Sequence, residues 1–302
     1  MLSAREEGLG LAGLVEEEAE LEVLATGFGF TEGPVWSPRD CCLLFSDIPG
    51  DTRYRWSSEH GCHVDLEGTN KANGLAFDRE DRLLSCEHAT SMLVRYEDGQ
   101  RSVLASHHDG LELNSPNDVV VHSCGAVYFT DPPYGRGDTP HGIGRAQALD
   151  FQGVFRLDPD GALRLLADDF AKPNGLCFDD GERFLYVNDT ERMHIRRFAV
   201  SADGGLSGGD VFFVQDGDPR PGFPDGMKLD VLGNIWVCGP GGIWIVSPGA
   251  EKLGVIAVPE VAANLAWGED DMRSLFVTAS TGLYRIRTLV AGARPRIGRQ
   301  EG

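Results

Sequence analysis

The sequence has no long apolar run and few basic residues. No window of its 302 residues approaches the ~20 apolar residues of a membrane-spanning helix. Its 27 Lys and Arg residues stand against 47 Asp and Glu, which gives a formal net charge of −20. Nucleic acids and anionic lipids both bind basic surfaces, so we expect neither a nucleic-acid nor a membrane partner.

Patterns typical of secretion or zinc binding are also missing. The 7 cysteines form no CxxC pair and no Cys/His zinc spacing. The first 20 residues lack the basic start and apolar core of a secretory signal. Reduced thiols fit this pattern best, and we expect a cytoplasmic protein, either a monomer or a homodimer.

The sequence does contain one pattern repeated six times. Each unit opens with an oxygen-bearing residue, followed by an apolar alternation, a polar turn and a second apolar run. The opening residues lie 39 to 57 residues apart, and propeller blades recur at about 40 to 50 residues. A Gly-rich polar stretch at 134–147, expected to be a loop, accounts for the longest interval. The units open at Glu32, Asn73, Asn117, Asn174, Asp225 and Asn264.

These units predict an all-β protein, a six-bladed β-propeller with a metal site on its central axis. Helical periodicity is nearly absent, apart from an expected acidic helix at 15–20. We expect one propeller domain at 21–290, between an acidic arm at 1–20 and a tail at 291–302. A strand at 21–25 would pair with one at 283–289, closing the ring without a free sheet edge. A two-domain sandwich is the less regular alternative.

The opening residues indicate what the axis binds. If the first strand of each unit lines the axis, the six polar side chains converge at one end of the channel. Buried carboxylates at Glu32 and Asp225 would repel each other unless a cation lay between them. A hard divalent cation takes carboxylate and amide oxygens, so Asn117 and Asn174 complete the expected metal ligands. Calcium is the expected ion, with Mg²⁺, Mn²⁺ and Zn²⁺ as alternatives.

Two points about these residues stay open. Asn-Gly and Asp-Gly pairs also form turns, so the repeats alternatively use them for backbone geometry alone. A second set of carboxylates, at Asp47, Asp131 and Asp189, ends the second strand of three units. Antiparallel pairing would bring these side chains back to the same mouth, where Asp131 is an expected substrate contact. Surface turn carboxylates are the alternative.

At these residues the chain resembles the family of gluconolactonases, senescence-marker protein (regucalcin) and luciferin-regenerating enzyme. The most specific stretches are LATGFGFTEGPVW from Leu24, NSPNDVVV from Asn114, FTDPPYG from Phe129, KPNGLCF from Lys172 and PDGMKLD from Pro224. CEH at 86–88 resembles the bacterial gluconolactonase branch. The resemblance covers about residues 21–287.

This resemblance implies roles for individual residues. It places the family's metal ligands on Glu32, Asn174 and Asp225, and a further asparagine, contacting metal-bound water or substrate, on Asn117. Animal members carry an arginine close before that asparagine to hold the sugar acid. Ser115 stands there in this chain, so the sugar preference of the animal proteins does not carry over.

The expected activity is metal-dependent hydrolysis of a sugar lactone. The metal would act as a Lewis acid on the lactone carbonyl, and water would attack the carbonyl carbon. Asp225 is the expected general base, and Asn117 would orient water or substrate. His88 and Tyr134 are expected substrate contacts, although each is alternatively structural. Other lactonase or phosphotriesterase activity on this scaffold, or a non-enzymatic calcium-binding propeller, are the alternatives.

Overall fold

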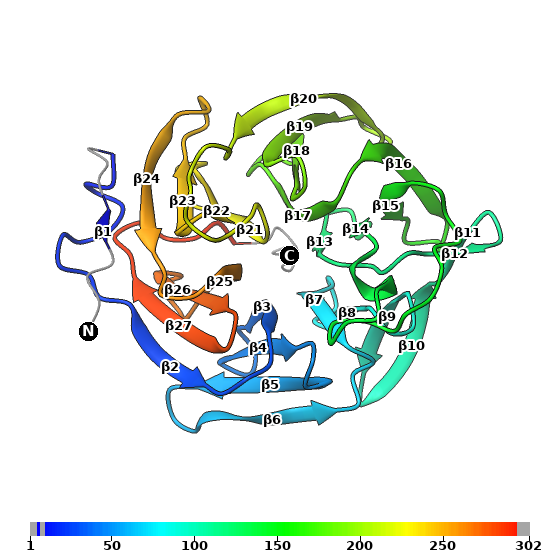
Figure 1. The fold of residues 1–302 in the computed structure, drawn as a ribbon, viewed down its shortest axis with the longest axis horizontal. Helices are drawn as coiled ribbons and strands as arrows, with labels where there is room; N and C mark the ends of the chain where they lie inside the picture. The colour runs from blue at the N-terminus through cyan, green and yellow to red at the C-terminus, as the bar shows by residue number, and fades with distance from the viewer. Residues whose placement is uncertain (1–4, 7–9, 295–302) are drawn as a thin grey trace, which may run out of the picture.

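The predicted ring of six blades is confirmed. The computed structural model describes residues 5–6 and 10–294. Six antiparallel sheets, each of four consecutive blade strands, surround one axis (Figure 1). One sheet carries an additional short strand, β1 (Arg5–Glu6), at its outer edge. The described residues contain no helix long and apolar enough to cross a bilayer.

In blades 1 to 5 the strands run outward from the axis in chain order, and in blade 6 the outermost strand comes from the start of the chain. Blade 1 consists of β3 (Thr31–Ser37), β4 (Cys42–Asp47), β5 (Thr52–Ser57) and β6 (Gly61–Glu67). Blade 2 consists of β7 (Ala72–Phe77), β8 (Leu83–Glu87), β9 (Met92–Glu97) and β10 (Gln100–Ala105). Blade 3 consists of β13 (Val119–Val121), β14 (Val127–Asp131), β15 (Gln152–Leu157) and β16 (Leu163–Phe170). Blade 4 consists of β17 (Pro173–Phe178), β18 (Phe184–Asp189), β19 (His194–Val200) and β20 (Leu206–Val214). Blade 5 consists of β21 (Met227–Leu229), β22 (Ile235–Gly239), β23 (Gly242–Val246) and β24 (Lys252–Ala257). Blade 6 consists of β25 (Ala262–Gly268), β26 (Ser274–Ala279), β27 (Gly282–Arg287) and β2 (Glu22–Thr26). A small hairpin, β11 (His107–His108) with β12 (Leu111–Glu112), and one short 3₁₀ helix, η1 (Tyr134–Arg136), lie in connections.

The two ends of the propeller meet in blade 6, as the sequence predicts. β2 pairs antiparallel with β27, with Glu22 opposite Arg285 and Thr26 opposite Gly282. This pairing supplies the fourth strand of the last blade from the start of the chain. Because ring closure needs contacts across the whole sequence, it ties all six blades into one cooperative unit.

The core lies between the blades. The second strand of each blade is buried along nearly its whole length, and β4 and β26 are buried at every residue. Its side chains alternate between two neighbouring blades, so both faces are apolar. Phe155 and Leu84, for example, belong to one cluster between blades 2 and 3. Blade-to-blade packing therefore holds the inner strands, and with them the axial residues, in fixed positions.

The N-terminal segment before β2, the outermost strand of blade 6, differs from the sequence prediction. Residues 15–20 form turns and a bridge, so the expected acidic helix is wrong. Leu11, Leu14 and Val15 are buried in the core of blades 5 and 6, and the Leu289 N–H donates to the Leu14 carbonyl at 2.8 Å. Burial of these apolar side chains stabilises an irregular path along the sheet. The arm boundary at residue 20 stays a prediction. Most of the predicted tail, 295–302, lies outside the described residues.

Candidate active site

The six opening residues belong to the innermost part of the six blades, around the axis, and together we call them the axial ring: Glu32, Asn73, Asn117, Asn174, Asp225 and Asn264. They lie on or directly before the innermost strands. All except Asp225 are at most 4% exposed, and Asp225 is partly exposed. The pairing register shifts beside several of them, for example between Glu32 and Val35 in blade 1. Such bulges turn a side chain out of the ladder, here toward the axis.

The glycine after each of four ring residues permits close contact between blades. A Cβ on Gly74 would lie 2.4 Å from the Asn117 carbonyl oxygen, and one on Gly175 would lie 2.2 Å from that of Asp225. Gly33 and Gly226 have equally close neighbours in the next blade. These pairs lie within or directly before strands and not in the turns between strands.

Gly175→Ala tests this close packing. The added methyl group would push the Asp225 backbone away from the axis. We expect a loss of about 1–3 kcal/mol in the free energy of unfolding and at least a tenfold lower kcat/KM, measured by chemical denaturation and lactone turnover. Gly249→Ala is the matched control, since its nearest neighbour is the Ser247 hydroxyl at 3.6 Å. Equal behaviour of the two variants would contradict the steric argument.

Hydrogen bonds between blades fix the backbone of the axial ring. The Ser46 hydroxyl donates to the Asn73 carbonyl at 2.8 Å, and the Thr130 hydroxyl donates to the Asn174 carbonyl at 2.8 Å. The Asn188 amide donates to the Asp225 carbonyl in the same way. Each donor lies on the second strand of the preceding blade, and the ring residues are therefore held on a rigid frame.

The carboxyl groups of Glu32 and Asp225 lie close enough to interact. Burial raises the pKa of Glu32 to about 7. Burial, the Glu32 charge and the close approach of the two carboxyl groups hold the pKa of Asp225 well above its usual range. Asp225 Oδ1 is buried and has no hydrogen-bond partner among the described residues. An unpartnered buried oxygen beside a second carboxylate is the environment that a cation stabilises.

Asp118 is a third axial carboxylate that the sequence analysis missed. It is 3% exposed, its Oδ2 has no partner among the described residues, and its charge raises the pKa values of both Glu32 and Asp225. It follows Asn117 at the position where four other units have glycine. That departure, Asn-Asp in place of Asn-Gly, was the available signal.

The two asparagines of the predicted metal set are both held in place by hydrogen bonds. Asn174 Nδ2 donates to the Thr190 hydroxyl at 3.0 Å, which fixes the amide and leaves Oδ1 for a ligand. Asn117 is 4% exposed, and its carbonyl accepts from the Gly74 N–H at 2.8 Å. Within the described part of the chain no three His, Cys, Asp or Glu residues form a metal-binding group. The candidate set therefore depends on amide oxygens, which Ca²⁺ accepts readily.

Of the three expected substrate contacts, only Tyr134 reaches the ring with an unpaired polar atom. Its hydroxyl is buried without a partner among the described residues. Burial and the nearby Asp225 charge raise its pKa. Tyr134 begins η1 in the long connection after β14, as expected for a loop that covers the mouth.

His88 and Asp131 are turned into the protein. His88 is 2% exposed, and burial lowers its pKa to about 4. Its Nδ1 bonds the His141 carbonyl at 3.1 Å, so the neutral ring donates there and its Nε2 accepts from Asn73 Nδ2 at 3.3 Å. Asp131 is fully buried and accepts from the Asn114 N–H at 2.7 Å. Both side chains hold neighbours in place.

The other carboxylates of the second set have the same local role. Asp47 accepts from the N–H groups of Gly29 and Phe30 at 3.0 Å each. Asp189 accepts from those of Ala171 and Lys172 at 2.8 and 3.1 Å. Each carboxylate thus fixes the loop that enters its own blade, close to the mouth. The alternative that they are surface turn carboxylates is wrong, since both are buried.

The loop at 134–147 crosses the mouth from blade 3 to blade 1. The His141 ring packs edge-on against Phe30, with ring centroids 5.0 Å apart, and Lys71 Nζ donates to the Pro140 carbonyl at 2.8 Å. Ser115 anchors the start of the loop, because its hydroxyl accepts from the Gly135 N–H at 2.9 Å. Ser115 is fully buried, so it holds the loop where animal relatives are expected to hold sugar.

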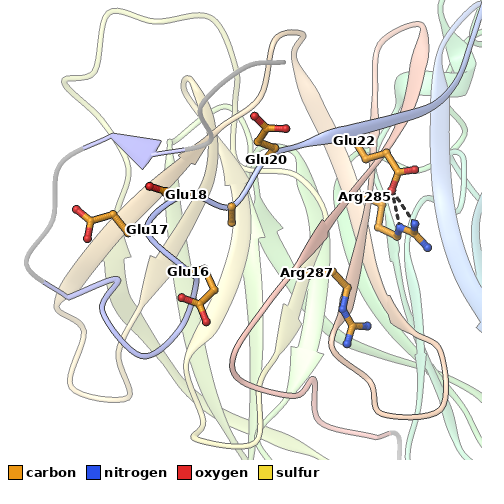
Figure 2. Close-up of a pocket in the computed structure, with 8 residues that line it drawn as sticks. Glu16, Glu17, Glu18, Glu20, Glu22, Arg285 and Arg287 are labelled. Carbon is orange, nitrogen blue, oxygen red and sulfur yellow. Dashed lines mark hydrogen bonds and ion pairs between the residues drawn. The ribbon is translucent and has the colours of Figure 1, made fainter.

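A separate cleft of about 590 Å³ lies at the outer edge of blade 6 and does not include the axial ring. Figure 2 shows Glu22 paired with Arg285 at this cleft, whereas Glu17 and Glu18 point away from the two arginines. Arg285 pairs with Glu22 at 2.7 Å and with Glu269 at 2.9 Å. Its cations are already neutralised and its carboxylates are exposed, so this cleft has no convergent catalytic groups.

Residues 30–281 match the model of the SMP-30/Gluconolactonase/LRE-like region. The chain belongs to this family. It is 32% identical to the gluconolactonase of Zymomonas mobilis, over 93% of this chain and 85% of that one. It is also 32% identical to pentonolactonase XacC of Haloferax volcanii, over 86% and 84% of the two chains. The solved gluconolactonase of Xanthomonas campestris superposes with a TM-score of 0.87 at 33% identity, covering 94% of each chain. The family prediction is confirmed.

Proposed function

We propose that this protein hydrolyses a sugar lactone with the help of a divalent cation. Ca²⁺ is the proposed ion, and Mg²⁺, Mn²⁺ and Zn²⁺ are the alternatives. The enzyme class, a gluconolactonase-like lactone hydrolase, follows from the family and from its two curated lactonase relatives. The proposal of a bound cation is supported by the interacting carboxyl groups of Glu32 and Asp225, and by Asp225 Oδ1, which has no hydrogen-bond partner among the described residues.

Glu32, Asn117, Asn174 and Asp225 would hold this cation. When bound, it supplies Lewis-acid chemistry that polarises the lactone carbonyl. The family membership and the oxygen-only donor set both support this assignment. Asp118 adds a third negative charge near the same ligands.

Asp225 is the proposed general base. Asp225 is partly exposed as a residue, whereas Glu32 is 3% exposed, so Asp225 is the acidic ring residue nearer to water at the mouth. It accepts the proton of the water that attacks the carbonyl carbon. Asn117 orients this water or the substrate. The proton then passes to the ring oxygen as the carbon–oxygen bond breaks, giving the hydroxy acid. Glu32 and Asn174 stay ligands.

The positions of His88 and Asp131 revise their proposed roles. His88 holds Asn73, and Asp131 holds the backbone of Asn114, three residues before Asn117. Both are therefore proposed as positioning residues. A cytoplasmic location is proposed from the described cysteines, which are all free thiols.

Tyr134→Phe tests the proposed substrate contact. Removing a hydroxyl that bonds only substrate should raise KM about three- to tenfold with little change in kcat. The Tm should stay unchanged, since the hydroxyl has no partner in the described protein. Tyr54→Phe, on the outer part of blade 1, is the control. An unchanged KM would remove Tyr134 from the substrate site.

The alternatives are separated by one comparison of substrates. Proton release from glucono-1,5-lactone is measured beside turnover of a phosphotriester, with the same metal-loaded protein. Turnover of the lactone in preference to the phosphotriester supports the proposal. A preference for the phosphotriester would favour the other hydrolase. Cation binding without turnover of either would favour a calcium-binding propeller.

A further inference from the structure

Lys228 is a basic residue inside the axial channel to which nothing above assigns a role. It lies on β21 between Met227 and Leu229, which are buried in the core with Cys177 of blade 4. Because side chains alternate along a strand, Lys228 faces the other way. Its Nζ lies 3.4 Å from Asn264 Oδ1 in blade 6 and donates to the Met227 carbonyl at 3.1 Å.

Hydrogen bonds connect Lys228 to the cation ligands. Asn264 Oδ1 accepts from Lys228 and from the Leu265 N–H at 2.9 Å. With its oxygen engaged on that side, Asn264 presents Nδ2 to Glu32 and donates to Oε2 at 3.0 Å. Asn264 and Glu32 are each at most 3% exposed. The ammonium group and the Leu265 N–H therefore both favour the orientation in which the Asn264 amide nitrogen faces Glu32.

Carboxylate groups outnumber ammonium groups beside the axial ring. Glu32, Asp118 and Asp225 interact with one another, and Lys228 is the cationic group that acts on Glu32. Asp118 Oδ2 and Asp225 Oδ1 are buried and have no hydrogen-bond partner among the described residues. Three ionised carboxylates and one ammonium leave a charge of −2, which a divalent cation neutralises and a trivalent cation exceeds.

We propose that Lys228 is a specificity-determining residue of the axial cation site: its ammonium group offsets one of three buried carboxylates, so that the site matches a divalent cation. The inference rests on the proposed function, because it assumes that the axial ring binds a cation. Repulsion between Lys228 and a bound ion grows with the charge of that ion. A trivalent ion therefore loses more than a divalent one.

The test compares Ca²⁺ and Tb³⁺ affinities of the full chain by calorimetry and terbium luminescence. Only binding that is lost in Asp225→Ala counts as axial, which removes terbium bound to surface carboxylates. In Lys228→Met the preference for Tb³⁺ over Ca²⁺ should rise on the order of tenfold. Lys228→Arg, which keeps the charge, should retain the wild-type ratio. Lys252→Met on the outer strand of the same blade is the matched control.

The outcomes separate the two proposals. A ratio that is unchanged in Lys228→Met, with axial binding intact, would overturn the role of Lys228 and leave the cation site standing. A wild-type protein without axial binding of either ion would overturn both. Loss of affinity for both ions by the same factor in Lys228→Met would show that the residue only orients Asn264, and it would also reject the proposed charge matching.

Discussion

Replacing Asp225 by alanine should abolish lactone hydrolysis, with kcat/KM reduced at least about 10³-fold. A general base alone contributes about 10² to 10⁴, and this variant also removes half of the Glu32–Asp225 pair that is proposed to hold the cation. Calcium affinity should fall in parallel. Proton release from glucono-1,5-lactone measures the first effect, and calorimetric titration with calcium measures the second.

The controls for Asp225→Ala separate chemistry from folding. Asp160→Ala changes an exposed turn carboxylate in blade 3 and should leave both readouts at wild-type values. Removing Asp225 also removes repulsion from Glu32 and Asp118, so the metal-free variant should be no less stable than the metal-free wild type. Activity within tenfold of wild type would exclude Asp225 as base and as ligand.

Removal of divalent metal should inactivate the protein and lower its Tm, and the loss of stability should grow with pH. A cation at 100 times its Kd stabilises the folded state by about 2.7 kcal/mol, which corresponds to a rise in Tm of roughly 4 °C in a chain of 302 residues. Activity should return with Ca²⁺ or another hard divalent cation. Differential scanning calorimetry with and without chelator, at pH 5 and pH 8, measures the effect.

The pH dependence follows from the raised carboxyl pKa values. The pKa of Glu32 rises from 4.5 to about 7 in the metal-free folded protein. Between these values the folded state binds more protons than the unfolded state, so stability falls as pH rises. The loss for Glu32 amounts to about 3 kcal/mol, and it is complete above pH 7. Burial raises the pKa of Asp131 to about 7 as well, which adds a loss in the same direction.

Glu32→Gln is the matched variant for this prediction. It keeps the size of the side chain but cannot ionise, so the metal-free variant should lose less stability between pH 5 and pH 8 than the wild type. The contribution of Asp131 remains in both proteins. Equal pH dependence of the two proteins, or activity that survives verified metal removal, would contradict the proposed cation site.

Serine at position 115 shows how a family pattern changes its physical role. The resemblance to animal members places an arginine for the sugar acid at this point. Ser115 instead is fully buried and donates to the Pro132 carbonyl at 2.5 Å. Its Cβ also leaves no room for a side chain at Gly135. Substrate recognition in this chain therefore has to come from other groups at the mouth, of which Tyr134 is the proposed one.

The sequence by itself determined the closed circle of six blades and the identity of the six axial ring residues. Period-two alternation and six spaced units predict strands, blades and the closing pair of β2 with β27 without any knowledge of distant contacts. The polar residue that opens each unit stood out because packing alone would favour an apolar one. Both signals are local, so they can be observed along the chain.

Only the tertiary structure decided how the blades meet at the axis. Asn264 bonds Glu32 across 232 residues of sequence, and Gly175 is required by the Asp225 backbone of the next blade. Asp118, directly before β13, and Lys228, on β21, carry no local signal of a shared site, and only the ring brings their charges beside Glu32. Likewise, His88 and Asp131 lie at the predicted mouth but point inward, because buried backbone groups needed partners. These contacts depend on the curvature of the closed ring, which no local pattern records.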